Sequence, residues 1–561
     1  NLVVFSFRLS NSAGSRKKAQ RAEAPFIPAS IELPISTPTP ARAIWQQFRA
    51  RVAFEVKGIV FNIAFWILLV FGMLLTGFAV FLIQPFYGTP NYPLTQIMIN
   101  SMIGGFILVP LVVVIYYASE LIWRERNVNF SDIVDATPAP SWVFLTAKLA
   151  GMIVVVTGLL SVALLITIAS QAIRGYFNFE LGQYAVRTVF DLIIPLTMLS
   201  MLAIFLQVLA NNKWLGIIAI GAVFIITAFV LDNIGLSHNL YQFPFVSLTP
   251  YSDMNGYGHF MGIQAWYHLY WGGVTLFLFV LASLLWNRGA LMPIRQRLIR
   301  LPQAFTPAAA GLAGVSLLTA IGAGGWIFYN TTVLNDYTPN TEAERLQAAF
   351  EREWREQLEG LPQPTITAVE FNVDIFPRDR RYTVTGTYEI ENQTGTDIPV
   401  VWVFYGTDEI NAQDIDGQTA ELRDDYANLY AFELDRPMQP GERRTLSFDV
   451  AVTNPGFRNS GNVSSVIYNG SFFNNGEFAP AIGFSRAMLI QNPAVRRRQD
   501  LPELERAFAL EDESRWNENS IRQDADFVDF RTIVSTSGDQ IAVAPGYLER
   551  EWTENGRRYF E

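Results

Sequence analysis

Seven apolar stretches, each long enough to cross the hydrocarbon core of a bilayer, constrain this chain more than any other feature. One helical crossing needs about 20 apolar residues, and a spanning segment must satisfy its own backbone hydrogen bonds, which favours helices. The stretches occupy residues 58–83, 97–118, 142–169, 188–210, 214–231, 264–286 and 306–329. The sequence therefore predicts a polytopic α-helical membrane domain of about seven spans.

Basic residues in the connecting segments predict the orientation of these spans. Lys and Arg concentrate in cytoplasmic loops. Arg174 and Arg187, which flank a loop on the opposite side, count against the orientation that the other segments give. Two connections, 84–96 and 233–265, lack Lys and Arg, whereas the basic segments are 1–57, 119–141 and 287–303. The N-terminal segment is therefore predicted to be cytoplasmic and the C-terminal part periplasmic.

Charge and composition exclude several classes of function. Residues 1–330 hold 19 Lys and Arg against 11 Asp and Glu, whereas residues 331–561 hold 22 Arg, no Lys and 40 acids. The net negative charge of the C-terminal part argues against nucleic-acid binding there, because such a surface would not neutralise a phosphate backbone. The absence of cysteine excludes disulfides, thiolate zinc sites and cysteine nucleophiles. Because the chain begins with Asn1 rather than Met, we expect it to be part of a longer protein.

Two segments precede the first span. Residues 1–40 mix Ser, Pro, Ala and a basic cluster, which predicts a solvated cytoplasmic linker. In residues 41–57, Ile44, Phe48 and Val52 recur every four residues while Arg51 and Glu55 lie elsewhere on the helix. This pattern is typical of an interfacial amphipathic helix, although it also fits the exposed start of the first span.

After the spans the sequence changes to a stalk and then to strands. Residues 331–364 predict a periplasmic stalk helix, with a capping-box pattern at Thr341 and Glu344. From residue 365 apolar residues alternate with polar ones, as at Phe371 and Val373. Short strands with polar turns predict a mostly antiparallel β-sandwich or saddle domain over 365–561.

An aromatic, Gly-rich loop separates the fifth and sixth spans. Residues 232–263 are expected to pack as short or re-entrant helices at the outer surface. His238, His259 and His268 lie in or near this loop with Asp232 and Asp253, but their spacing matches no metal-ligand pattern. We interpret them as polar residues at an aromatic membrane interface.

Two segments resemble known families. The six-span pattern of 41–303, with the inside loop ELIWRERNVNFSDIVDATPAPSW, resembles the membrane domain of type-two ABC transporter permeases of the exporter class. Residues 304–330 add a seventh span. The phrases GSFFNNGEFAPAIGFSR and STSGDQIAVAPGYLEREWTENGRRYFE make 365–561 similar to the N-terminal β domain of membrane-alanyl-aminopeptidase-type zinc metallopeptidases. Their order on one chain resembles bacterial fusions of permease and aminopeptidase.

The resemblance implies an inner-membrane protein with two functional centres, and this chain lacks the motifs of both. It has no Gly-x-x-x-x-Gly-Lys-Ser/Thr loop for nucleotide phosphates, so a separate ABC ATPase subunit is implied. It has no His-Glu-x-x-His, and no His follows His268, so zinc is expected only in a longer protein. A second permease half, upstream on the same polypeptide, is also implied.

The inside loop holds the candidate residues for coupling to an ATPase, since an exporter must pass motion to its spans through a rigid cytoplasmic element. The alternative is a solvated loop in which Trp123 anchors the helix at the membrane interface. The candidates are Glu120, Trp123, Arg124, Glu125, Arg126, Asp132 and Asp135.

A second set of candidates lies in the aromatic stretch 471–484. Phe472, Phe473, Glu477 and Phe478 either line a substrate groove of a complete peptidase or belong to an ordinary hydrophobic core. The sequence thus leaves three hypotheses. These are a permease component of an ABC exporter, a membrane-anchored zinc aminopeptidase whose catalytic domain lies beyond this chain, and a non-catalytic envelope peptide-binding or assembly protein.

Overall fold

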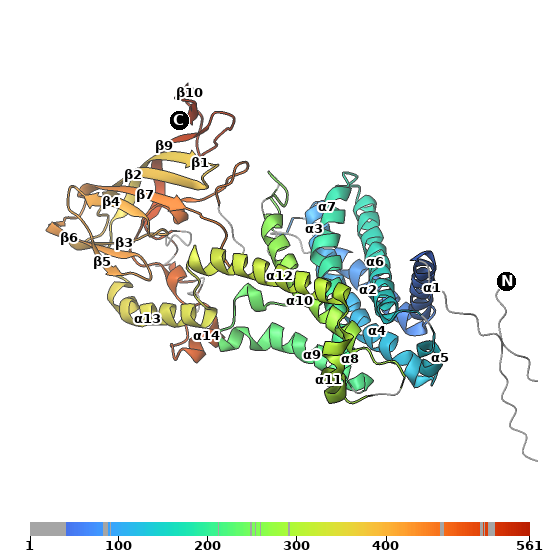
Figure 1. Cartoon of the computed structure of the whole chain (residues 1–561). Coiled ribbons are helices and arrows are strands. Elements are labelled where there is room, and N and C mark those ends of the chain that lie inside the picture. Colours follow the sequence, from blue (N-terminus) through green and yellow to red (C-terminus); the bar gives the residue numbers. More distant parts are fainter. Residues whose placement is uncertain are drawn as a thin grey trace, which may run out of the picture.

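The computed structural model contains a helical part and a β-rich part, with the helix Asn340–Leu358 between them in the chain (Figure 1). The predicted linker 1–40 lies outside the described residues, as do Asp253 and His259. The described residues are 41–561 except 82–87, 90, 138, 211, 247–249, 253, 259, 290–291, 461–464, 505–508, 510, 514–515 and 517–521. Apolar helices followed by a mostly antiparallel sheet domain confirm the predicted fold class.

In the described part of the chain, six helices are long and apolar enough to cross a membrane, and a bent pair adds a seventh crossing. The pair is α3 (Thr95–Phe106) and α4 (Leu108–Asn127), bent by 42°. Pro110 has no N–H to bond the carbonyl of Phe106, which accounts for the break. The others are α2 (Ile63–Phe81), α6 (Ser141–Ile173), α7–η1–α8 (Leu181–Arg187, Thr188–Ile193, Ile194–Leu209), α9–η2 (Lys213–Ile225, Ile226–Val230), α10 (Phe260–Leu285) and α12–η5 (Pro307–Phe328, Tyr329–Val333).

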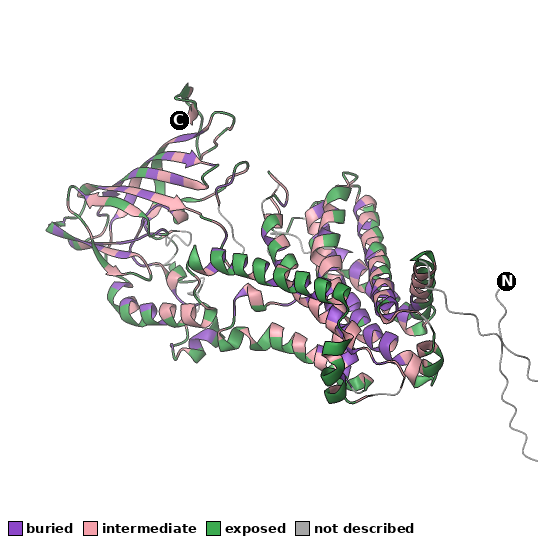
Figure 2. Cartoon of the chain, in the orientation of Figure 1, coloured by how far each residue is buried: buried purple, intermediate pink, exposed green. Residues whose placement is uncertain are grey.

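The helical part has a buried centre and an apolar exterior. Val113, Tyr117, Met152 and Leu199 belong to the central cluster contributed by α4, α6 and α8. Figure 2 shows long exposed faces on α12 and other outer helices. These faces carry large apolar side chains, including Leu318 on α12. Exposed apolar surface of this extent is what contact with lipid requires.

Helices α10 and α12 approach each other closely at a glycine. A methyl group on Gly273 of α10 would lie 2.7 Å from the carbonyl oxygen of Ser316 and 2.8 Å from the amide nitrogen of Ala320, both on α12. Backbone atoms cannot move aside as a flexible side chain can. Gly273 therefore sets the distance between these two helices, as small residues do at membrane helix contacts.

The amphipathic segment forms a separate helix, α1 (Ala41–Val60), which packs beside α6. A turn at Phe61 and Asn62 separates it from α2. Glu55, which the sequence placed away from the apolar stripe, is wholly buried between the helices. Partners on α4 and α6 compensate its charge.

The β part contains two sheets. One has seven strands in the order β10-β11-β9-β1-β2-β7-β4, and the other has four in the order β5-β6-β3-β8. All described pairings are antiparallel except that of β1 with β9. The strands are β1 (Thr365–Phe376), β2 (Arg381–Glu391), β3 (Ile398–Phe404), β4 (Ile410–Ile415), β5 (Glu421–Asp424), β6 (Leu429–Met438), β7 (Arg443–Thr453), β8 (Ala481–Ile482), β9 (Ala525–Ser537), β10 (Glu551–Glu554) and β11 (Arg557–Phe560).

The predicted stalk is helix α13 (Asn340–Leu358), and it packs against the four-stranded sheet. Trp354 lies 5.7 Å from Trp402 of β3 between ring centroids and donates a hydrogen bond to Asp424. The predicted capping box at Thr341 and Glu344 is wrong, because the helix starts at Asn340 without a side-chain cap. Glu344 instead forms a charge-assisted contact with Arg498 of α14 (Pro493–Arg498).

Polar contacts fix the outer loop of the helical part to the β part. Asn335, just after η5, donates hydrogen bonds of 2.9 Å to the carbonyl oxygens of Asn330 and Pro455. The amide of Asn239, in η4 (Asn239–Tyr241), donates to Asn459 Oδ1. These bonds join the last span and the outer loop to the segment that follows β7.

Candidate functional site

The C-terminal end of α4, where the coupling candidates begin, contacts helices α8 and α9. Glu120 forms an ion pair with Lys213, the first residue of α9. Trp123 is buried, and its Nε1–H donates a 2.9 Å hydrogen bond to Gln207 Oε1 on α8. Trp123 is therefore part of the helix packing and not an exposed interface anchor.

A cluster of five charged side chains joins the same end of α4 to α1 and α6. We call Arg51, Glu55, Arg124, Glu125 and Lys148 the charge cluster. Arg124 Nη2 lies 2.6 Å from Glu55 Oε2, Lys148 Nζ lies 3.0 Å from Glu55 Oε1, and Arg51 pairs with Glu125. The side chains of Glu55 and Lys148 are 0% exposed. Removing one partner of a buried pair leaves an uncompensated charge, so the cluster resists separation of the three helices.

A glycine on α1 makes room for this cluster. A methyl group on Gly58 would overlap the guanidinium of Arg124. Leu121 adds a second acceptor for Lys148, whose Nζ donates to the Leu121 carbonyl oxygen at 2.5 Å. The end of α4 is thus held by its backbone as well as by its charges.

The loop after α4 is tied to the segment that follows α10. Arg126 Nη2 donates to the carbonyl oxygen of Asn287 at 2.8 Å. Asp135, in the short helix α5 (Ser131–Asp135), accepts a 2.8 Å hydrogen bond from the amide of Gly289. Arg297 of α11 (Ile294–Ala304) donates to the carbonyl oxygen of Val208 at the end of α8. Figure 1 shows α5 and α11 at the end of the helical part away from the strands.

The tip of this loop is exposed and apolar. Val128, Phe130 and Ile133, which we call the loop tip, are exposed, and Asp132 between them is exposed as well. A surface that combines a rigid base with exposed apolar side chains is suited to docking a protein partner. Chemically, the described side chains of this site offer ion pairs, hydrogen-bond donors and an exposed apolar patch.

Six of the seven coupling candidates are therefore held by contacts to other elements, and Asp132 lies at the exposed tip. The sequence analysis missed their partners, above all Lys148 and Glu55. Lys148 is the only charged residue in the apolar stretch 142–169. A charge inside such a stretch requires a partner, and that signal could have found the cluster.

The groove candidates have different surroundings in the structure. Phe473 stacks on Tyr382 with ring centroids 4.1 Å apart, and Phe478 is buried in the β core. Glu477 accepts a hydrogen bond from Ser465, and Phe472 is exposed. Phe473 and Phe478 thus occupy the core, as in the alternative that the sequence left open.

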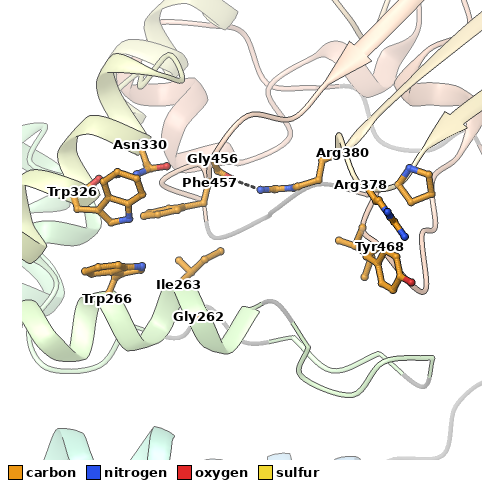
Figure 3. Close-up of a pocket in the computed structure, with 12 residues that line it drawn as sticks. Gly262, Ile263, Trp266, Trp326, Asn330, Arg378, Arg380, Gly456, Phe457 and Tyr468 are labelled. Carbon is orange, nitrogen blue, oxygen red and sulfur yellow. Dashed lines mark hydrogen bonds between the residues drawn. The ribbon is translucent and has the colours of Figure 1, made fainter.

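A cavity of about 380 Å³ lies elsewhere, between the two parts of the molecule (Figure 3). Helices α10 and α12 contribute one wall, and the β1–β2 turn contributes the other with the segment after β7. The side chains that line it include Ile263, Trp266, Trp326, Arg378, Arg380 and Phe457.

The described residues do not fit a zinc site. Among them, no group of three His, Asp or Glu side chains could hold a metal ion. His238 accepts a hydrogen bond at Nδ1 from the amide of Leu240, and its Nε2 lies 2.9 Å from the hydroxyl of Thr331. The imidazole therefore carries its proton on Nε2 and donates it to Thr331. Burial lowers the pKa of His238 to about 4.

Comparison with known proteins gives structural likeness only. No family model and no curated protein matches the chain. Similar solved structures include an M1 zinc metallopeptidase from Deinococcus radiodurans, 14% identical over 35% of this chain and 38% of that chain, with a TM-score of 0.23. A variant of a two-domain M1 zinc metallopeptidase bound to L-tryptophan is 16% identical over 36% of this chain and 39% of that chain, with a TM-score of 0.22. The chain thus spans under two-fifths of these proteins, and such scores carry no functional argument.

Proposed function

We propose that this chain is a permease component of an ABC-type exporter of the bacterial inner membrane, with its N-terminal segment cytoplasmic and its C-terminal domain periplasmic. The observation that carries the proposal is the bonded end of α4, which joins α1, α6, α8, α9 and the segment after α10. The resemblance of the six-span pattern supports the same function. A separate ABC ATPase subunit and a second permease half are the partners.

In this proposal the loop tip docks into the ATPase subunit, and the charge cluster passes the movement on. Val128, Phe130 and Ile133 are exposed and gain about 1.5–3 kcal/mol each when fully buried by a partner. Because Glu55 and Lys148 are sealed from water, their pairing holds α1 and α6 to α4 during a displacement. The helices then move together, and the path between two permease halves changes its opening.

Crosslinking tests this proposal. Residues 1–561 contain no cysteine, so Ile133→Cys places the one thiol of this segment at the loop tip. In native membranes we expect it to crosslink to an ABC ATPase subunit, identified by mass spectrometry. Leu318→Cys, exposed on α12, is the matched control and should give no such product. Failure of both Ile133→Cys and Val128→Cys to reach any ATPase would refute the docking role.

A second candidate function rests on exposed apolar side chains near the end of the β part. Phe527 and Tyr547 are each 98% exposed, and Val543 is 91% exposed. A folded domain rarely leaves large apolar groups uncovered unless another surface packs on them. Together with the resemblance of 365–561, this supports a membrane-anchored zinc aminopeptidase whose catalytic domain would cover these residues. The zinc ligands would come from that domain.

Assays of the full-length protein separate this candidate from a binding role. Bound zinc, with hydrolysis of aminoacyl substrates that a chelator abolishes, would support the peptidase. Retention of peptides without hydrolysis would instead support the third hypothesis, a non-catalytic envelope peptide-binding or assembly protein. Neither result depends on the crosslinking to an ATPase, so the transport and peptidase proposals fail independently.

A further inference from the structure

The cavity between the helical part and the β part combines an apolar wall with a cationic wall. On the helical side, Trp266 and Trp326 lie with ring centroids 5.9 Å apart, and both are exposed. Phe328 and Tyr329 continue the exposed aromatic surface at the end of α12. Trp and Tyr concentrate where spans meet the lipid headgroups. The apolar wall therefore lies at headgroup level.

Two arginines from the β1–β2 turn form the opposite wall (Figure 3). Arg380 Nη1 donates a 2.6 Å hydrogen bond to the carbonyl oxygen of Gly456, and its Nε is buried without a hydrogen-bond acceptor. The Arg378 guanidinium lies 5.6 Å from the centroid of the Tyr468 ring. Within the described residues, neither arginine forms an ion pair with a carboxylate.

This lack of carboxylate partners is unusual for this domain. Residues 331–561 carry a net charge of −18, and most arginines of the described β part pair with acids, as Arg423, Arg436 and Arg531 do. Burial lowers the pKa of the Arg380 guanidinium, which reflects the cost of its desolvated charge. An anion in the cavity would offset that cost.

The segment after β7, which lines the cavity at Gly456, approaches the end of α12 closely. A methyl group on Gly456 would overlap the side-chain oxygen of Asn330, and its φ of 55° lies in the left-handed region that favours glycine. Gly456 therefore brings its carbonyl and the adjacent Phe457 against the end of α12. The arginines are positioned beside the aromatic wall as a consequence.

We propose that this cavity binds an anionic phospholipid, with its phosphate at Arg378 and Arg380 and its acyl chains along Trp266 and Trp326. The apolar wall and its place at the ends of two spans favour a lipid over a free anion. The proposal requires that the helices lie in a membrane, and it does not depend on transport or peptidase activity. Arginine offers the fork of donors that suits a phosphate group.

Native mass spectrometry of the detergent-solubilised full chain tests the proposal with phosphatidylglycerol, phosphatidylcholine and inorganic phosphate. We expect wild-type protein to retain phosphatidylglycerol in preference to phosphatidylcholine, without displacement by inorganic phosphate. The double variant R378Q/R380Q should bind it at least tenfold more weakly. Arg436→Gln, which removes an exposed arginine paired with Glu442, should bind it as wild type does.

Two single variants keep the test decisive if the double variant does not fold. Arg378 is exposed, so Arg378→Gln should fold normally and still weaken phosphatidylglycerol binding severalfold. Trp326→Ala should weaken it as well, through the acyl chains. Unchanged retention in Arg378→Gln and the double variant would overturn the proposal. Full displacement of the lipid by inorganic phosphate would also overturn it, because it would reveal a site for free anions.

Discussion

Lys148 Nζ lies 3.0 Å from Glu55 Oε1 at a point where neither side chain reaches the surface. The pair joins the first amphipathic helix to a membrane span, and the contacts of Arg124 with Glu55 and of Arg51 with Glu125 extend it to α4. In Glu55, burial opposes ionisation, but attraction to Lys148, Arg51 and Arg124 outweighs it and lowers the pKa. A charged group in this position thus has a structural role that its local sequence conceals.

Replacing Lys148 by Met should destabilise the helical part. The variant removes one of the three cations that contact Glu55, together with the bond from Lys148 to the Leu121 carbonyl, while Arg51 and Arg124 remain, which should cost about 1.5–3 kcal/mol. Thermal unfolding in detergent, followed by fluorescence, measures the loss. Arg531→Gln, in an exposed pair with Glu561, is the control and should change stability by less than about 1 kcal/mol. Equal effects of the two substitutions would contradict the buried role of Lys148.

Gly273→Ala should force α10 and α12 apart. The added methyl group would lie within 2.8 Å of two backbone atoms of α12, so the helices must shift and the unfolding temperature should fall. Overpacking of this kind costs about 1–3 kcal/mol. Gly311→Ala on α12 meets no neighbouring atom and serves as the control. A wild-type unfolding temperature for Gly273→Ala would show that the contact is looser than described.

Two arginines of α14 give a matched comparison of buried and exposed ion pairs. Arg496 binds both carboxylate oxygens of Glu351 in a buried pair, whereas Arg498 binds Glu344 in a partly exposed one. Arg496→Met should cost about 3–5 kcal/mol, and Arg498→Met no more than about 1 kcal/mol. Limited proteolysis near 493–498 would detect the release of α14 from α13. Similar cleavage rates in both variants would contradict the larger contribution that we expect from the buried pair.

The outer loop should weaken in acid because of His238. Its folded pKa, about 4, lies below the ordinary value of 6.5, so the neutral form stabilises the fold. This stability is complete above pH 6.5 and falls by about 1.4 kcal/mol per pH unit down to pH 4. His238→Gln cannot titrate and should flatten that slope. Hydrogen exchange of residues 236–242 at pH 7 and pH 5 measures the effect, and parallel profiles would refute it.

The spans could be predicted from the sequence because length and apolar character alone decide whether a helix crosses a bilayer. The alternation of apolar and polar residues at Phe371, Val373 and Ile375 also depends only on neighbouring residues, and these side chains are buried as expected. The parallel pairing of β1 with β9 could not be predicted. Ile366 pairs with Ala525, and no local pattern indicates a partner so distant in the sequence.

The candidate site was predictable only in part for the same reason. The sequence identified the candidate residues at the end of α4. Their partners Glu55, Gln207 and Lys213 are far away in the chain, so the sequence did not identify the contacts. A charged residue near a membrane can face water or face another helix. Only the packing of α1, α8 and α9 distinguishes these cases.

The bonds of Asn335 link any tilt of the seventh span to the domain outside the bundle. One amide group holds the end of η5 and the loop after β7 together, and α13 packs against the four-stranded sheet. A rotation of α12 would thus rotate the β part with it, so that the spans and the two sheets would change position together.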